Sequence, residues 1–381
     1  MQLTRDTENH GAWRQRGCTS GDGIPPATRR GIARAGLAFA LSGVWLIATL
    51  SFALTVGNVY AHDGLTPAPG TKAERRNIRF NHLTVTEGLS HAAVTAIAQD
   101  DRGFMWFGTQ DGLNRYDGQQ IVTFLRDSKD PGQLPHNWIW ALHSDSNGNL
   151  WVGTDGGGLA VLDPQTETFS TYRSRKDDPE TLNSDRIRTL FEDRAGVLWI
   201  GTDGGGLTRY EPATGKFRTY RHDPDDRFSL PTDSVLAILE DPHGSLWVGT
   251  NGGGLAQLDR DSGRFQRHGH DPADPTSLSN DRVRALLLGR DGWLWVGTYE
   301  GGLNRLHIAS GVFERFDPGS TTDDGLTSKR VRSLFRDKAG TIWVGTENGL
   351  FTWVPKQRQF IRYGHVPSDP DSLSDNRVSA L

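Results

Sequence analysis

One phrase of about ten residues recurs six times along this chain and constrains its fold more than any other feature. It joins a hydrophobic-Trp-hydrophobic-Gly-Thr run to a glycine-rich turn and a leucine, as in Leu198–Leu207 (LWIGTDGGGL). Successive tryptophans of the phrase are 45 residues apart once and then 48 residues apart four times. They are Trp106, Trp151, Trp199, Trp247, Trp295 and Trp343. A period near 48 residues is typical of the four-stranded blades of a β-propeller.

The third unit shows how one period predicts one blade. Its β-type runs are Arg186–Phe191, Val197–Thr202, Leu207–Tyr210 and Lys216–Tyr220. Asp and Gly separate the first three runs, and both residue types favour tight hairpin turns. The glycine triplets that recur in three units are therefore interpreted as turns and not as phosphate-binding loops.

The repeat tryptophans are predicted to be structural. Side chains alternate along a strand, so Trp199 and Gly201 share one face of the second strand. We expect each indole to pack against the adjoining blade, and the glycine two residues later to leave room for that blade to approach closely.

The two ends of the repeat region predict how the ring closes. Residues 77–83 match the outer strand of a unit, and residues 371–381 match the first strand of a seventh unit. We therefore expect an all-β, seven-bladed β-propeller over residues 78–381, with six complete blades and a partial seventh closed by the N-terminal strand. We also expect that the natural gene product continues beyond Leu381 or that this is a truncated open reading frame.

The N-terminal region predicts export. Three arginines, the last of them Arg34, precede the apolar stretch Gly36–Val56, and small residues stand before His62. This layout favours a signal peptide or a membrane anchor in residues 1–61, with both alternatives open, and a linker in residues 62–77. The expected location is the periplasm, either free or anchored to the inner membrane.

Charge and cysteine content exclude several partners and stabilising devices. The formal net charge is −4, and residues 1–61 carry six arginines against three acidic residues, so the rest is acidic. An acidic domain repels phosphate backbones, which argues against a nucleic-acid partner. Cys18 is the only cysteine. It precedes the apolar stretch, so no internal disulfide can stabilise the exported part.

No catalytic or cofactor-binding motif is found, and two weak metal candidates have simpler interpretations. The chain lacks a G-x-x-x-x-G-K-[ST] loop, an H-E-x-x-H motif and a G-x-S-x-G elbow. Asp145–Asn149 lacks the acidic alternation of a calcium loop and is interpreted as a turn. His268 and His270 could bind a metal, but His222 and His365 stand near the same repeat position, which favours a linker role. No metal and no cofactor are expected.

Departures from the repeat at the mouth of the central channel provide the candidate ligand site. Trp138 and Trp140 replace an Arg-x-Arg pair at the start of a first strand. Tyr299-Glu300 and Glu347-Asn348 replace Asp-Gly in second-strand turns. Aromatic faces and carboxylates suit a sugar site, but irregular packing explains them equally well.

Arginines at the same strand starts are a second candidate. They could form a positive mouth for an anion, or they could pair with acidic residues of neighbouring loops. Both alternatives stay open. The residues are Arg186, Arg188, Arg282, Arg284, Arg330 and Arg332.

The units resemble the two-component regulator propeller repeat. The similarity rests on first strands such as Ser279–Leu286, D-x-x-G turns, the L-W-V-G-T strand and the G-G-L-N-R-L/Y strand, and residues 103–118 are close to that family's first repeat. The resemblance implies a periplasmic sensor whose longer relatives carry a histidine kinase or diguanylate cyclase output domain. It also implies an oligosaccharide as the small-molecule ligand, and C-terminal signalling domains as partners.

Three functions remain in view for the chain. The favoured one is a ligand-sensing extracytoplasmic module that is not itself an enzyme, because the sequence contains neither kind of output domain. The alternatives are a protein-interaction scaffold and, with less support, a propeller lyase or hydrolase. Dimerisation is left open.

Overall fold

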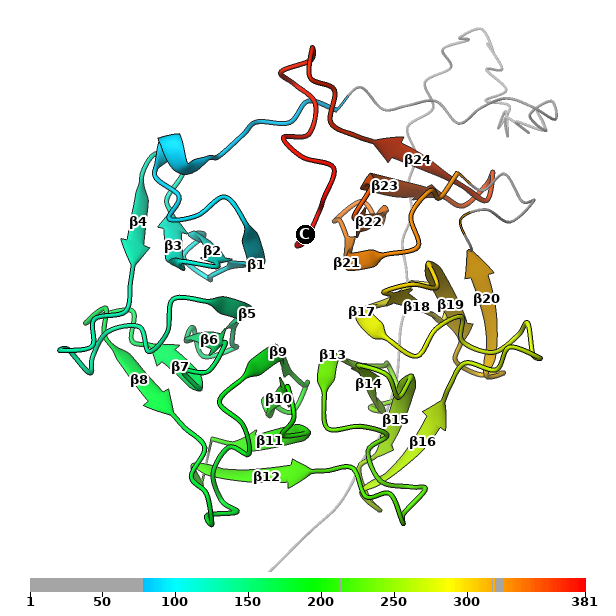
Figure 1. The fold of residues 1–381 in the computed structure, drawn as a ribbon, viewed down its shortest axis with the longest axis horizontal. Coiled ribbons are helices and arrows are strands. Elements are labelled where there is room, and N and C mark those ends of the chain that lie inside the picture. The colour runs from blue at the N-terminus through cyan, green and yellow to red at the C-terminus, as the bar shows by residue number, and fades with distance from the viewer. Residues whose placement is uncertain (1–77, 213, 317, 319–324) are drawn as a thin grey trace, which may run out of the picture. The chain divides into compact units, whose positions relative to one another are not determined.

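The described part of the chain is a ring of β-sheets. The computed structural model describes residues 78–381 apart from 213, 317 and 319–324 (Figure 1). In this part, six antiparallel sheets of four strands each follow one another around a common centre. The predicted all-β propeller is thereby confirmed. The predicted signal or anchor segment and the linker after it lie outside the described residues.

Each of the six sheets is one sequence repeat. Blade one consists of β1 (Val94–Gln99), β2 (Met105–Thr109), β3 (Gly112–Tyr116) and β4 (Ile121–Phe124). Blade two consists of β5 (Ile139–Ser144), β6 (Leu150–Thr154), β7 (Leu159–Leu162) and β8 (Phe169–Tyr172). Blade three consists of β9 (Ile187–Glu192), β10 (Leu198–Thr202), β11 (Leu207–Glu211) and β12 (Lys216–Tyr220).

The second half of the ring repeats this order. Blade four consists of β13 (Val235–Glu240), β14 (Leu246–Thr250), β15 (Leu255–Asp259) and β16 (Arg264–His268). Blade five consists of β17 (Val283–Leu288), β18 (Trp293–Thr298), β19 (Leu303–His307) and β20 (Val312–Phe316). Blade six consists of β21 (Val331–Arg336), β22 (Ile342–Thr346), β23 (Gly349–Val354) and β24 (Gln359–Tyr363). A single 3₁₀ turn, η1 (Val85–Glu87), precedes blade one among the described residues.

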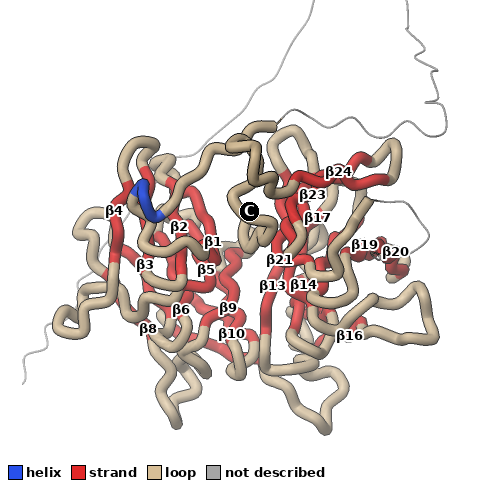
Figure 2. The backbone as a smooth tube through the Cα atoms, turned by 45° about the horizontal axis from the view of Figure 1, so that its top comes forward, coloured by secondary structure: helices blue, strands red, loops and turns tan. Residues whose placement is uncertain are grey.

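The first strand of every blade lies nearest the centre of the ring. These inner strands are β1, β5, β9, β13, β17 and β21, and the fourth strands form the rim (Figures 1 and 2). Because the six units share one strand order, all inner strands start at the same end of the ring. We call this end the mouth.

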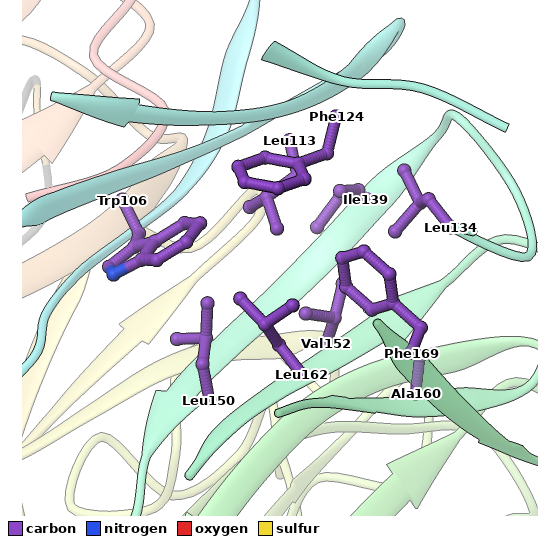
Figure 3. Close-up of a cluster of buried hydrophobic side chains, with 10 residues drawn as sticks. All are labelled: Trp106, Leu113, Phe124, Leu134, Ile139, Leu150, Val152, Ala160, Leu162 and Phe169. Atoms are coloured by element: carbon purple, nitrogen blue, oxygen red, sulfur yellow. The ribbon is translucent and has the colours of Figure 1, made fainter. Parts of the chain in front are cut away.

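The core lies between neighbouring blades, as the repeat tryptophans predict. Trp106 of blade one has no exposed surface and packs with Leu150 and Val152 of blade two (Figure 3). Trp199 occupies the corresponding position between blades three and four, and Trp247 between blades four and five. Aromatic side chains of the rim strands, such as Phe169, close each interface from outside. Packing between blades therefore takes the place of a single central core.

The second-strand glycines allow the close approach that was predicted. A Cβ on Gly201 would lie 2.7 Å from Val235 Cγ1 in the next blade. A Cβ on Gly249 would lie 2.6 Å from Val283 Cγ1 of its own neighbour. Real Cβ atoms do not approach other carbon atoms this closely, so only glycine fits beside the inner strand of the following blade.

An aspartate six residues before the tryptophan completes the interface in five of the six blades and was not predicted. The Trp247 indole Nε1 donates a hydrogen bond to Asp241 Oδ2 at 2.9 Å, and Trp199 donates to Asp193 at 2.8 Å. Asp241 also accepts bonds from the amides of His243 and Ser245, which shape the turn between the first two strands. Burial alone would raise the pKa of the Asp193 carboxyl, but its hydrogen bonds with the Trp199 indole, the Val197 amide and Arg260 together lower it.

The predicted partial seventh blade is not confirmed, because its segments form no strand. Residues 78–84 and 364–381 lie in the opening between blades one and six (Figure 1). They contact each other through Phe80 N, which donates to Asp371 O at 2.9 Å. Gly349 N of blade six donates a hydrogen bond to Asn376 O, just as Gly254 N of blade four donates to Asp281 O at the start of blade five. The start of a seventh unit therefore contacts blade six in the same way as the start of a complete unit contacts the blade before it.

No helix among the described residues has the length and apolar character needed to cross a membrane.

Candidate functional site

The mouth is built from one special position in each inner strand. The antiparallel pairing of β17 with β18 shifts register between Val283 and Ala285, so Arg284 is an extra residue in that strand. The same β-bulge occurs in all six blades. Its extra residues are Thr95, Trp140, Arg188, Leu236, Arg284 and Arg332. A β-bulge re-aims its side chain relative to the regular alternation, and here it does so beside the central axis.

The predicted tryptophans at the mouth stack on each other. The ring centroids of Trp138 and Trp140 are 5.3 Å apart, and the Arg188 guanidinium lies 4.3 Å from the Trp140 centroid. Both indole Nε1 atoms are buried without a hydrogen-bond partner in the described structure. The two residues are therefore brought together, but Arg188 covers the face of Trp140 that a sugar ring would need.

The predicted tyrosine is also covered by arginine. The guanidinium carbons of Arg282, Arg330 and Arg284 lie 4.5, 4.9 and 5.4 Å from the Tyr299 ring centroid. Such cation–π contacts use the ring face that would otherwise stack on a ligand. Glu300 beside it lies 3.8 Å from Arg330.

Most arginines at the mouth pair with carboxylates of the second-strand turns. Arg332 Nη2 and Arg330 Nη1 bind Glu347 at 2.6 and 2.9 Å. Burial alone would raise the pKa of Glu347, but these two hydrogen-bonded arginines lower it below its ordinary value. For these two arginines the pairing alternative holds.

Blade three follows the same scheme. Arg188 Nη2 lies 2.9 Å from Asp203 Oδ2, and Arg186 lies 3.0 Å from Asp155 and 3.2 Å from Asp203. In blade five, Arg282 Nε donates to Asn251 Oδ1 at 3.1 Å. Arg284 has neither an ion pair nor a hydrogen-bond acceptor among the described residues.

Of the weak metal candidates, His270 and Asp145 make linker and turn contacts, whereas the linker role predicted for His268 is wrong because this residue ends β16 and packs in the core. His270 Nδ1 contacts Leu278 O at 2.7 Å, and the equivalent His222 and His365 make the same contact with Leu230 and Leu373. Asp145 binds the amides of its own turn. Within the described residues, no group of three or more potential metal ligands occurs.

One histidine–carboxylate pair was not predicted from the sequence. His143 Nε2 lies 3.5 Å from Glu192 Oε2, where β5 and β9 end, opposite the mouth. Glu192 also accepts hydrogen bonds from the amide and hydroxyl of Ser146. Since this carboxylate already holds a neighbouring turn, the arrangement indicates a structural contact between blades two and three.

His268 belongs to the core and not to a site. It replaces the aromatic residue that ends the rim strand in the other blades, as Tyr220 does in blade three, and its ring lies 5.5 Å from Trp247 and 6.2 Å from Phe313. Its Nε2 atom is buried without a partner. Burial lowers the pKa of this imidazole.

His268→Tyr is expected to make the protein less sensitive to acid. The unfolded histidine binds a proton as the pH falls below about 6.5, whereas the folded one resists protonation until lower pH, so acidification favours unfolding of the wild type. The stability advantage of the variant should grow by about 1 kcal/mol between pH 7.5 and pH 5.5. Urea unfolding at both pH values measures it. His243→Tyr, at an exposed histidine, is the control, and equal pH profiles for all three proteins would contradict the explanation.

Comparison with known proteins assigns the repeats. The Two component regulator propeller family matches six segments, each of which contains an inner strand, the second strand and the turn after it. They are residues 88–111, 133–156, 181–204, 229–252, 277–300 and 325–348. The chain carries two component regulator propeller repeats. All candidate residues at the mouth lie inside these repeats.

Solved structures with a similar fold include the extracellular domain of a two component system. The extracellular domain of a proposed hybrid two component system from B. thetaiotaomicron is 25% identical with a TM-score of 0.67, over 79% of this chain and 39% of that chain. PorZ, a surface component of the type-IX secretion system of Porphyromonas gingivalis, is 16% identical with a TM-score of 0.60, over 77% of this chain and 44% of that chain. The latter likeness shows the fold alone.

Two further proteins are similar to this chain, one in fold and one in sequence. A virginiamycin B lyase from Staphylococcus aureus is 14% identical with a TM-score of 0.53, over 73% of this chain and 86% of that chain, and shows the fold alone. Histidine kinase P4 of Formosa agariphila is 39% identical over 59 residues, which are 16% of this chain and 4% of that protein. This chain thus matches only a small part of the sequence of that relative.

Proposed function

We propose that this chain is the ligand-sensing, extracytoplasmic module of a two-component signal-transduction receptor. The observation that supports it is the set of six two component regulator propeller repeats, together with the 25% identical likeness to an extracellular two component domain. In this proposal, the module lies in the periplasm, and residues 1–61 export it or anchor it to the inner membrane. Its partners are a small-molecule ligand and the signalling domains of a longer chain.

Sensing without turnover is supported by the chemistry of the mouth. Its carboxylates Asp203 and Glu347 are held by arginines, and neither forms an ion pair or hydrogen bond with a histidine among the described residues. Paired carboxylates with lowered pKa values are poor general acids at neutral pH. The lyase and scaffold alternatives are kept as outcomes of the test.

A ligand screen is expected to raise the thermal unfolding midpoint with one chemical class of compound. The panel contains neutral oligosaccharides, acidic oligosaccharides and small organic anions. A ligand at about 100 times its Kd stabilises the folded state by about 2.7 kcal/mol. Mass spectrometry of the recovered compound should show it unchanged.

Other outcomes would replace the proposal. Conversion of a compound to product would favour a lyase or hydrolase. A flat panel combined with stoichiometric binding of another protein over one face of the ring would favour a scaffold.

A further inference from the structure

The arginines that start the inner strands outnumber the carboxylates that pair with them. Six arginines start the inner strands of blades three, five and six, and four carboxylates of the adjoining turns face them. The carboxylates are Asp155, Asp203, Glu300 and Glu347. None of the six bulge residues is acidic. This set therefore has an excess of two positive charges.

Arg282 and Arg284 have no carboxylate partner among the described residues, and Arg284 also lacks the kind of hydrogen-bond acceptor that Asn251 provides for Arg282. Arg284 is half-buried on the β17 bulge, and the charges acting on it come from Arg332, Arg188 and Arg282. Burial, and then repulsion by these arginines, lowers the pKa of its guanidinium. Among the described residues, only the Tyr299 ring, 5.4 Å away, acts favourably on this cation, so its place among three like charges needs another explanation.

The neighbouring groups also supply hydrogen-bond donors in excess. Arg188 Nε and Arg332 Nε are buried without an acceptor, as are the indole Nε1 atoms of Trp138 and Trp140. Buried donors are normally satisfied, and unsatisfied ones cluster where a ligand or water completes them. Donors without acceptors favour a partner rich in oxygen lone pairs.

The aromatic residues argue against a neutral sugar as the main determinant. Arg188 covers Trp140, and Arg282 and Arg330 cover Tyr299 at less than 5 Å. These stacked guanidiniums remain rigid and leave their edges for hydrogen bonds. The chemistry left open at the mouth is thus a planar, cationic set of donors around Arg284.

We infer that the mouth binds the carboxylate of an acidic small-molecule ligand, and that Arg284 receives it through charge-assisted hydrogen bonds. A guanidinium matches a carboxylate in a two-pronged geometry, and Arg188 and Arg332 lie close enough to strengthen the local positive potential. That this ligand is the molecule sensed by the receptor rests on the proposed function. The site itself can be tested separately.

Calorimetric titration of the purified chain with sodium glucuronate, at constant ionic strength, tests the site. We expect saturable binding with a Kd in the millimolar range, as befits a small probe, and no binding of the matched neutral sugar glucose. Arg284→Gln should weaken glucuronate binding at least tenfold, because it removes the charge and the fork. Arg126→Gln, at an exposed arginine of the rim, should bind as the wild type does.

The free protein provides a second readout that a structural role would not produce. Arg284→Gln should raise the thermal midpoint by about 1–3 °C without ligand, because it removes like-charge repulsion at a half-buried position. A lowered midpoint would instead show that Arg284 supports the fold, and would overturn the assignment.

The two proposals can fail independently. Equal glucuronate binding by wild type and Arg284→Gln, or no binding to either, overturns the carboxylate site. If neutral oligosaccharides stabilise the same protein, the sensing function stands without it. Binding of sulfate in place of glucuronate, with loss in Arg284→Gln, would also overturn the carboxylate class while retaining Arg284 as an anion-binding residue.

Discussion

Trp247→Ala is expected to lower the free energy of unfolding by about 3–5 kcal/mol. The indole is 2% exposed and lies between blades four and five, against Val283, Leu294 and Val296. Truncation opens a cavity in this interface. It also removes the indole N–H that donates a hydrogen bond to Asp241 Oδ2 at 2.9 Å. A loss of this size is a large share of the net stability of a typical domain.

Urea unfolding followed by circular dichroism measures this loss. Trp293→Ala is the matched control, because Trp293 begins β18 at a half-buried position and packs on His307 and Arg305 near the surface. We expect the control to lose about 1 kcal/mol. Similar losses for both variants would mean that the repeat tryptophans are not what holds neighbouring blades together.

The repeat made most of this fold predictable from the sequence. Strand positions in the third unit, the glycine turns and the buried tryptophans follow from period-two alternation and turn chemistry, which are local properties. The close approach at Gly201 was also predictable, since a glycine beside a buried indole has few other roles. The way in which the ring closes was not predicted correctly. Residues 78–84 and 371–381 were expected to contribute strands to a seventh blade, but they form no strand. They do contact each other, through Phe80 and Asp371.

The aspartate partner of each tryptophan shows a signal that was present but not used. Asp193 and Asp241 stand six residues before their tryptophans, and the same spacing recurs in five of the six blades. Blade five has Gly289 there instead. Once the first two strands are paired as a hairpin, this spacing brings the carboxylate to the indole edge.

The candidate site was only partly predictable. Sequence analysis selected Trp140 because it departs from the repeat, and Arg188, Arg284 and Arg332 because they share one place at the start of the first strand. The structure brings all four to one mouth. Whether an arginine is paired depends on contacts between blades, such as that of Arg186 with Asp155 across 31 residues. The bulge that re-aims these side chains comes from strand register, which hydrophobic pattern does not specify.

Gly206→Ala is expected to lower the free energy of unfolding by about 3–5 kcal/mol. Gly206 has φ 86°, a left-handed conformation that favours glycine, and an added Cβ would overlap the Tyr220 carbonyl oxygen of the rim strand. Gly206 N also donates to Asp233 O at 2.8 Å, which ties the turn to blade four. The overlap is with backbone, so relief requires β12 to move.

Gly204 in the same turn provides a control that separates the cost of the backbone conformation from the cost of steric overlap. It has the same φ of 86°, but a Cβ there would meet no atom within 4 Å. Gly204→Ala should therefore lose only the cost of a left-handed alanine, about 1 kcal/mol. Urea unfolding of the two variants side by side measures the difference. If both lose the same amount, backbone conformation alone explains the glycine triplets, and the close packing of the rim strand on this turn contributes nothing to them.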